Sequence, residues 1–388
     1  MPIWSPAMIF GSAGSSGYVV ENSVWFDGSA DELTWTPGVD GDGAGKKFTI
    51  SWWQKLLSDD VKTLMSFGAN GGDALHIQYE WGANKYPNFS DGSNSTGTDP
   101  SPQYVTSNML ERDFTAWSHW VYKFDSDQAS AADRHEIFKN GVALINGADA
   151  ITWDLASVQA SSGRVSRCTM QYEHNIGNLV ASSDFKGFYI ADFILVDNQG
   201  LDADSFGEYD DNGVWVPIDP SGLTFGTNGV WLDFAVAPGT GNGAGTDVSG
   251  NDNHFTDTSM TAAQQVTDTC TDDADNDIGN YCTWNPLSSS PNNTFSEGNL
   301  RCAMPSSGST QTVRGSVVIQ SGKWHWEATL NSGSGSWIGV LQGTNSATNI
   351  NYSGDTLPGA VGVSMTYCDD GKIYNDNGGG GGAGGVSS

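Results

Sequence analysis

Short runs of apolar residues, most of them alternating with polar ones, dominate the first two thirds of the chain. The clearest lie at residues 24–28, 47–53, 117–124 and 188–196. A period of two is typical of β-strands that bury one face, and clusters of Gly, Asn, Asp and Pro separate the runs. Many such runs without helical patterns between them predict an antiparallel β-sandwich or jelly roll.

The stretch HEIFKNGVAL, residues 135–144, gives the most local prediction. Its Asn140-Gly141 dipeptide stands between two β-prone runs. Asn and Gly both tolerate the positive φ angles of a type I′ turn, so the stretch predicts a two-residue β-hairpin that joins neighbouring strands.

A second block of strand patterns follows an acidic stretch at residues 269–279. Residues 313–319, 322–330 and 337–340 have strand character, and a Gly-rich run comes near the end. We therefore expect five parts: an N-terminal arm (1–18), a jelly roll (19–265), an acidic linker loop (266–284), a second β-sandwich (285–377) and a Gly-rich tail (378–388).

The charge of the chain excludes one class of partner. Lys and Arg total 16 against 45 Asp and Glu, a formal net charge of −29. A nucleic-acid backbone would be repelled from almost every face. Such acidity is typical of an exposed, soluble protein, and it also offers carboxylates to divalent cations.

The N-terminal residues predict neither export through a signal peptide nor a membrane anchor. The first 20 residues contain neither a basic n-region nor a sustained apolar region. No run approaches the roughly 18 to 20 apolar residues of a membrane span. We expect no membrane insertion, and a protein made in the cytoplasm that leaves the cell by lysis or inside an assembly.

The order of these stretches resembles a known family. FDGS, FTISWW, WSHWVYKFD and IFKNGVAL follow one another as in a laminin-G-like, concanavalin A-type jelly roll. The longer series, LDADSFGEYDDNGVWVPIDPSGLTFGTNGVWLDFA, DVSGNDNHFT, YCTWNPL and GKWHWEATL, resembles large virion-associated proteins of tailed, often marine, bacteriophages. In that family a laminin-G-like domain precedes a SPRY-like β-sandwich. Here the SPRY-like strands expected after GKIYN are missing, so we expect this sandwich to be incomplete, through truncation or completion by a partner chain.

The resemblance implies a non-enzymatic virion protein of the tail or tail fibre. Its partners would be other virion proteins, further copies of itself, for example in a trimer, and a host-surface glycan. Capsid decoration or a head fibre is an alternative, and a glycan depolymerase on the same fold is a second one. A secreted lectin is disfavoured by the absent signal sequence.

Catalytic spacing is not evident. Glycosidases of concanavalin-like shape carry a Glu-x-Asp-x-x-Glu strand with acid and nucleophile on one face. The nearest approach, Glu208-Tyr209-Asp210, has no second Glu and is better explained as a turn. The histidines show no zinc-binding spacing.

The acidic loop 272–279 is a candidate Ca²⁺ site. Asp273, Asp275 and Asp277 alternate along it, and alternating carboxylates can surround one hard cation. The competing interpretation is a solvated interdomain loop. A second candidate group is Asp247 with Asn251 and Asp252.

Aromatic residues are candidate sugar contacts. Trp52 and Trp53 must point to opposite faces of a strand, so Trp53 is a candidate unless both faces of the sheet are covered. Trp81, Tyr86 and Tyr104 fall in a segment rich in Asn, Ser, Gly and Asp. Packing in the core or between subunits is the competing explanation.

The cysteines leave one pairing open. There are five, an odd number, too sparse for a disulfide scaffold. Cys270 and Cys282 bracket the acidic loop and form a candidate disulfide, whereas a protein made in the cytosol starts reduced.

Overall fold

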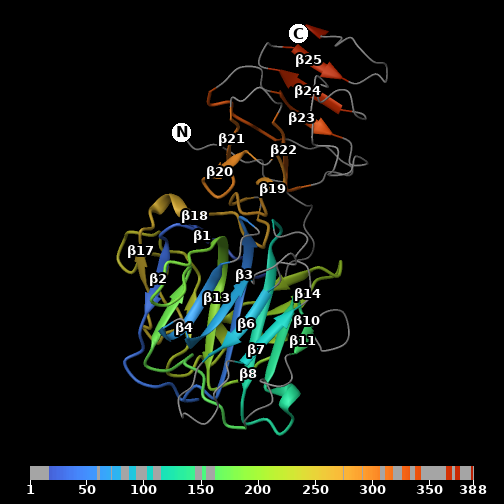
Figure 1. Cartoon of the computed structure of the whole chain (residues 1–388). Helices are drawn as coiled ribbons and strands as arrows, with labels where there is room; N and C mark the ends of the chain where they lie inside the picture. Colours follow the sequence, from blue (N-terminus) through green and yellow to red (C-terminus); the bar gives the residue numbers. More distant parts are fainter. Residues whose placement is uncertain are drawn as a thin grey trace. The chain divides into compact units, whose positions relative to one another are not determined.

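The computed structural model describes residues 17–58, 62–70, 72–79, 87–92, 103–107, 115–144, 151–153, 162–273, 275–290, 292–305, 311–317, 326–332, 337–341, 364–368, 372–375 and 386–387. These residues form β-strands, loops and short 3-10 turns, with no α-helix among them (Figure 1). The all-β class predicted from the sequence is confirmed. Within the same ranges, no helix has the length and hydropathy of a membrane span.

Two eight-stranded antiparallel sheets make up the larger part of the molecule. Sheet I contains, from edge to edge, β10 (Val142–Ala143), β9 (His135–Lys139), β8 (Ser118–Asp125), β3 (Lys47–Leu56), β13 (Gly187–Asp197), β1 (Ser23–Asp27) and β18 (Gln265–Val266), with β16 (Val230–Leu232) also paired to β13. Sheet II contains β11 (Ile151–Trp153), β7 (Gln103–Ser107), β6 (Pro87–Asp91), β5 (Asp73–Tyr79), β4 (Thr63–Asn70), β12 (Glu173–Ile176), β2 (Glu32–Trp35) and β17 (Thr256–Thr258). The 3-10 turns are η1 (Ala131–Asp133), η2 (Ala203–Ser205), η3 (Pro220–Gly222), η4 (Gly243–Gly245) and η5 (Ala262–Gln264).

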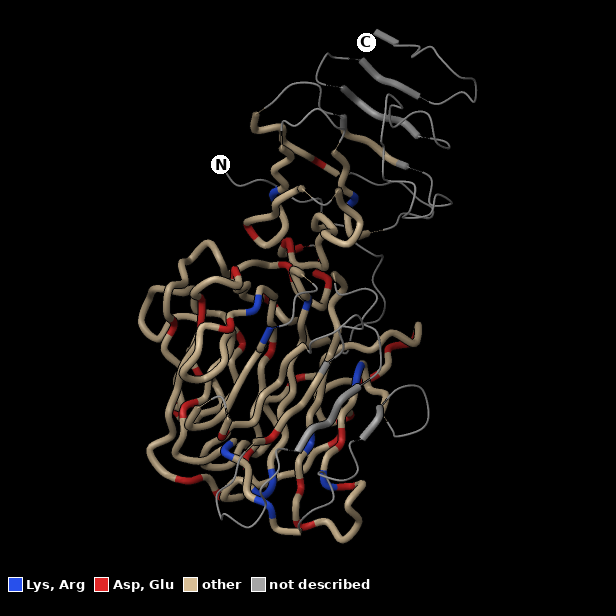
Figure 2. The backbone as a smooth tube through the Cα atoms, in the orientation of Figure 1, with Lys and Arg blue, Asp and Glu red and all other residues tan. Residues whose placement is uncertain are grey.

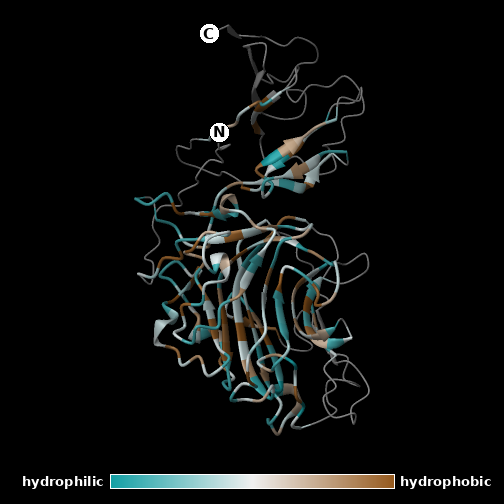
Figure 3. Ribbon diagram, turned by 90° about the vertical axis from the view of Figure 1, so that its left-hand side faces the viewer, coloured by the Kyte–Doolittle hydropathy of each residue, from teal (hydrophilic) through white to brown (hydrophobic). Residues whose placement is uncertain are grey.

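The main hydrophobic core fills the space between the two sheets. Alternate residues of β3, Phe48, Ile50 and Trp52, point into it. Phe89 of β6 approaches from the opposite sheet, with its ring centroid 6.4 Å from that of Trp52. The apolar stretches follow the central strands (Figure 3). This is the jelly-roll sandwich that the alternation predicted, held mainly by burial of large side chains at about 1.5–3 kcal/mol each.

The predicted hairpin is confirmed. Val142 pairs with Lys139, and the two turn residues between them have positive φ, 47° at Asn140 and 78° at Gly141. Gly141 is required for a second reason: a Cβ atom there would lie 2.4 Å from the Trp215 ring.

The outer face of sheet I is covered as well. One cluster on it contains Trp53, Trp117 and Tyr189, and another contains Ile194 and Phe206. Part of the cover is a hairpin of β14 (Gly207–Tyr209) and β15 (Trp215–Pro217). Its turn is closed by the Asp210 carboxylate, which accepts hydrogen bonds from two backbone N–H groups. The predicted turn therefore begins at Asp210, whereas Glu208 and Tyr209 belong to strand β14 and not to the turn.

The chain divides into two compact units, with the boundary between Asn280 and Tyr281. Residues 265–280 belong to the jelly-roll unit. The other unit contains β19 (Trp284–Ser289) paired with β22 (Val313–Gly315), β20 (Thr294–Ser296) paired with β21 (Arg301–Ala303), and a four-stranded antiparallel sheet of β23 (Trp337–Leu341), β24 (Ser364–Cys368), β25 (Lys372–Asn375) and β26 (Val386–Ser387). Residues 326–330, predicted as strand, are irregular. The SPRY-like character of this unit stays a prediction.

Candidate functional site

The candidate site lies where β13 changes its neighbour along one edge. Strand β1 pairs with residues 187–190 of β13, and β16 pairs with residues 193–195 along the same edge. Neither pairing includes Asp192. If the two registers continued, Asn22 of the first segment and Asp233 of the second would both lie opposite Asp192. Only one strand can pair there, so β1 and β16 diverge and leave a gap along this edge of β13.

A β-bulge takes Asp192 out of the normal alternation of β13. The register with β3 shifts between Ala191 and Ile194, and Asp192 has a left-handed backbone with φ of 47°. Before the bulge the even-numbered residues Phe188 and Ile190 enter the main core, whereas beyond it the odd-numbered residues do. Bulges re-aim side chains in this way. Without it, Asp192 would follow Phe188 and Ile190 into the apolar core.

The gap holds a cavity of about 240 Å³. One wall is the segment that leads into β1, and the other is β16 with the residues that follow it. The lining residues are Tyr18, Val19, Val20, Glu21, Asn22, Asp192, Trp231, Asp233 and Ala235. The cavity thus combines two aromatic rings with three carboxylates and one amide.

Asp192 is only 3% exposed, and the two oxygens of its carboxylate differ in their hydrogen bonds. Trp231 Nε1 donates to Oδ1 over 2.7 Å, and the Tyr18 hydroxyl donates to the same oxygen over 3.2 Å. In the part of the chain that the structure describes, no group donates to Oδ2 and no basic side chain pairs with this carboxylate. Oδ2 is not among the fully enclosed polar atoms, so it remains accessible from the cavity.

Burial raises the pKa of Asp192 from 3.8 to about 7, although the hydrogen bonds from Trp231 and Tyr18 act in the opposite direction. The nearby Asp233 and Asp219 carboxylates raise this pKa further. Burial and the neighbouring Asp192 likewise raise the pKa of the Tyr18 phenol far above its usual range, so Tyr18 is a fixed hydrogen-bond donor. The site is therefore poised to exchange one proton near neutral pH.

The loop after η4 fixes the backbone of Trp231. Trp231 N–H donates to the Asp247 carboxylate over 2.9 Å, and Asp247 also accepts bonds from Ser249 and from Asn253 N–H. Asn251 donates to the backbone carbonyls of residues 226 and 229. The Asp247 group that was a second Ca²⁺ candidate thus acts as a network of turn hydrogen bonds that positions one cavity wall.

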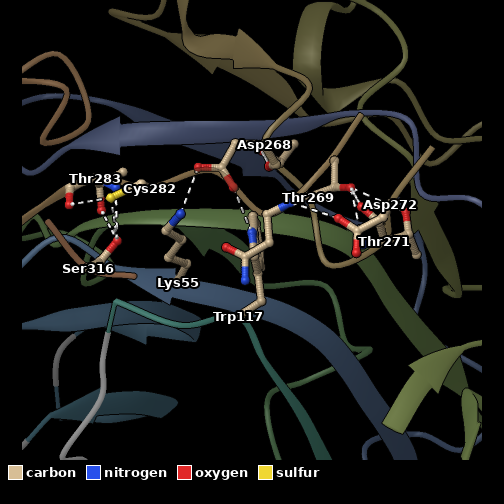
Figure 4. Close-up of polar contacts among 11 residues, drawn as sticks. Lys55, Trp117, Asp268, Thr269, Thr271, Asp272, Cys282, Thr283 and Ser316 are labelled. Carbon is tan, nitrogen blue, oxygen red and sulfur yellow. Dashed lines mark hydrogen bonds and ion pairs between the residues drawn. The ribbon is translucent and has the colours of Figure 1, made fainter. Parts of the chain in front are cut away.

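A buried ion pair anchors the segment that holds the other wall. Asp268 accepts hydrogen bonds from Lys55 Nζ over 2.8 Å and from Trp117 Nε1 over 2.9 Å (Figure 4). Three residues further on, the Thr271 hydroxyl bonds to both the N–H and the C=O of Val20, over 3.1 and 3.2 Å. The segment from Asp268 to Thr271 therefore holds the chain that leads into β1.

Trp53, a predicted sugar contact, is buried instead. It is 4% exposed, and its ring stacks on His119 with centroids 4.9 Å apart. Trp215 Nε1, which can only donate, bonds to His119 Nδ1, so the proton of the neutral imidazole lies on Nε2 and faces Ser51. Burial lowers the pKa of His119 to about 3. The prediction for Trp53 was wrong because both faces of sheet I are covered.

The other predicted sugar contacts cannot be placed as side chains. Trp81 and Tyr86 lie outside the described residues. The backbone of Tyr104 belongs to β7, where it pairs with Ser90 of β6, and its side chain is likewise outside the described part. These three predictions remain untested.

The acidic loop is a compact turn. Asp273 and Ile278 exchange backbone hydrogen bonds of 2.9 and 3.0 Å, and the Asp273 carboxylate accepts from Asp275 N–H and Asn276 Nδ2. Asp277 has a left-handed φ of 53°. Among the described residues, no three acidic, His or Cys side chains converge as a metal site. The expected convergence of Asp273, Asp275 and Asp277 is therefore not observed, since Asp273 caps its own turn.

Cys270 and Cys282 are both thiols in the structure. Cys270 packs against the outer cluster of sheet I, and burial raises the pKa of its thiol. Cys282, in the other compact unit, lies 3.7 Å from the Thr283 carbonyl and 3.8 Å from Ser316 Oγ (Figure 4). Each sulfur contacts residues of its own unit, and a disulfide between Cys270 and Cys282 stays a prediction.

The residues of the cavity were missed in the sequence. The available signal was a single charged residue, Asp192, inside the apolar run FYIADFILV. A charge in the middle of a buried strand requires either a partner or a break in the alternation. The partners Tyr18 and Trp231 lie far from it in sequence, and no local pattern connects them.

Comparisons with known proteins identify no family for this chain. No protein-family model and no curated protein matches it. Among solved structures, it is similar to a heptameric SAP-like pentraxin from Limulus polyphemus (11% identity, 48% of this chain and 80% of that chain, TM-score 0.33) and to domains LG4-5 of the mouse laminin α1 chain (11% identity, 58% and 50%, TM-score 0.31). A third similarity is to the CBM40 of Ruminococcus gnavus IT-sialidase (12% identity, 48% and 96%, TM-score 0.28). This chain spans about half the length of the laminin pair. TM-scores below 0.5 establish no function.

Proposed function

We propose that this chain is a non-enzymatic glycan-binding protein and that the Asp192 cavity is its sugar site. The observation that carries the proposal is the open Oδ2 of a buried carboxylate in a cavity walled by Tyr18 and Trp231. Sugar sites in proteins typically pair aromatic rings with carboxylates and amides, and Asn22 adds an amide here. A cavity of about 240 Å³ has room for one sugar ring.

The wider setting that we propose is the surface of a phage virion, in the tail or a tail fibre. This part rests on the sequence resemblance alone. The acidic residues spread over the jelly-roll unit (Figure 2) suit an exposed virion protein that binds no nucleic acid. Many copies on one particle would turn a weak single-site affinity into strong adhesion.

A glycan depolymerase is the second candidate, and one observation favours it. Asp192 and Asp233 line the same cavity, and glycosidases use a pair of carboxyl groups of which the acid has a raised pKa, as Asp192 has at about 7. Binding is the better explanation because cleavage inside a polymer requires sugar subsites on both sides of the bond, and the cavity has room for one ring.

A glycan array probed with the purified chain tests the proposal. We expect retention of a defined set of host-surface glycans by the wild-type protein and loss of retention by a Trp231→Ala variant that remains folded. Release of reducing sugar from the retained glycans would favour the depolymerase. Absence of retention on any glycan would overturn the binding function. Labelled antibody on intact phage particles tests the tail location separately.

A further inference from the structure

The Asp192 cavity is acidic and has no described counter-charge. Asp192 is the buried carboxylate of its lining and Glu21 an exposed one, and Asp233 and Asp219 act on Asp192 electrostatically. Among the residues that the structure describes, no Lys or Arg lines it. A ligand that brings a positive charge would therefore be held more strongly than a neutral ligand of the same shape.

The free oxygen of Asp192 sets the geometry of such a contact. Oδ1 already accepts bonds from Trp231 and Tyr18, which fix the carboxylate in place, whereas Oδ2 is open to the cavity. A preorganised acceptor of this kind forms its best bond with a charged N–H donor. The two aromatic side chains of the walls also favour a cation over a neutral group.

A metal ion fits this site less well than an ammonium group. Divalent cations need several oxygen ligands around one point. In the described part of the chain, no three carboxylate, His or Cys groups are close enough to share an ion. An ammonium group needs only one or two acceptors, and the remaining carboxylates then act through longer-range attraction.

We propose that the cavity recognises a sugar unit with a free, protonated amino group, in which the ammonium group donates to Asp192 Oδ2. This inference rests on the proposed glycan-binding function and narrows it to amino sugars that are not N-acetylated. The sugar ring lies between the walls formed by Tyr18 and Trp231, and the rest of the glycan leaves past Glu21. N-acetylation removes the charge and adds bulk beside Asp192, which is nearly enclosed.

Matched ligand sets separate this inference from the function on which it rests. Each set contains one free amino sugar, its N-acetyl form and the hydroxyl sugar of the same ring: glucosamine, N-acetylglucosamine and glucose, and the galacto and manno equivalents. Isothermal titration calorimetry of the full chain at pH 7 and about 0.15 M salt limits attraction by the net charge, since the screening length is about 8 Å. We expect the amino member of at least one set to bind at least about tenfold more tightly than the other two.

Two variants locate the effect. Asp192→Asn keeps an oxygen acceptor and a residue type that tolerates positive φ, so we expect a folded protein that has lost the preference for the amino sugar. Asp127→Asn removes the same formal charge from an exposed residue that does not line the cavity, and we expect it to keep the preference.

Three results would contradict the inference in different ways. Equal binding of the amino and neutral members would overturn the amino-sugar specificity and leave the glycan-binding function standing. A preference that persists in Asp192→Asn would remove Asp192 as the recognition group. Absence of binding for every member, together with an empty glycan array, would overturn both the specificity and the proposed function.

Discussion

Asp192, in strand β13 of sheet I, and Asp268, in the segment that follows β18, are both buried carboxylates. Their surroundings differ in one respect. Asp268, 4% exposed, has the Lys55 ammonium group 2.8 Å away and an indole donor from Trp117. Asp192, 3% exposed, has an indole and a phenol donor but no basic partner among the described residues. One charge is neutralised within the fold, and the other is left to a proton or a ligand.

The difference separates a structural carboxylate from a candidate binding carboxylate. Removing one member of a buried ion pair leaves an uncompensated charge and is strongly destabilising. A buried acid without a counter-charge costs stability whenever it is ionised, and such a cost is typical of functional sites. Asp268 therefore belongs to the framework that holds the cavity wall, and Asp192 belongs to the cavity itself.

The largest effect is expected from Lys55→Met. The substitution leaves the Asp268 charge buried without its ammonium partner, and we expect the free energy of unfolding of the jelly-roll unit to fall by about 3–5 kcal/mol in urea titrations. Lys62→Met is the control, because the Lys62–Asp184 pair is about one third exposed and such pairs contribute about 1 kcal/mol or less. Equal losses in the two variants would contradict the structural role of Asp268.

Asp192→Asn should stabilise the protein in a pH-dependent way. The folded-state pKa of about 7 lies above the ordinary value of 3.8, so the folded protein takes up the proton first. The contribution of this group to stability is therefore full below about pH 4 and is lost as the pH rises through about 7. We expect the variant to exceed the wild type by about 4 kcal/mol at pH 8 and by little at pH 4.

Urea titrations at several pH values check this second prediction. A stability difference that is constant with pH would mean that Asp192 does not titrate between pH 4 and pH 8. A variant less stable than the wild type at pH 8 would contradict the claim that the Asp192 carboxylate has no basic partner.

Trp231→Phe should have a smaller effect than either change. It removes the 2.7 Å bond to Asp192 Oδ1 and keeps an aromatic ring against Phe225. We expect a loss of about 1–2 kcal/mol at pH 8, because hydrogen bonds to charged groups are among the stronger ones. Tyr18→Phe removes the longer, 3.2 Å bond to the same oxygen and should cost less. The reverse order in thermal unfolding would contradict the assignment of Trp231 as the main donor.

The smallest expected effect is that of Thr271→Val. This variant tests whether the segment that contains Asp268 supports the wall of the Asp192 cavity. The substitution keeps the shape of the side chain and removes both bonds to the Val20 backbone. We expect a stability loss of about 1 kcal/mol and a several-fold weaker affinity for cavity ligands, measured by calorimetry. Unchanged affinity would show that the wall does not depend on this segment.

Much of the fold could be predicted because its signals are local. Alternation in β3 and β8 and the Asn140-Gly141 turn each depend on a few neighbouring residues, and the structure has them as expected. The fate of Trp53 could not be predicted in the same way. Alternation shows that Trp53 points away from Trp52. Whether that face of sheet I is exposed to solvent depends on residues from distant parts of the sequence that pack over it.

The cavity could not be predicted from local sequence patterns for a similar reason. The bulge at Asp192 falls where two strands, separated by about 200 residues in sequence, meet along one edge of β13. The cavity was not predicted although it is present, whereas in the acidic loop a convergence was predicted that is not observed. The Asp residues of this loop match a cation pattern, yet the Asp273 carboxylate accepts hydrogen bonds from groups within its own turn.

The most direct test of the central claim is an NMR titration of the Asp192 carboxyl carbon, assigned by its disappearance in Asp192→Asn. We predict titration near pH 7 in the free protein and a displacement to lower pH when a protonated amino sugar is present, since a neighbouring positive charge favours the carboxylate. Titration near the ordinary value of 3.8 in the free protein would contradict the claim that Asp192 is a buried carboxylate without a counter-charge.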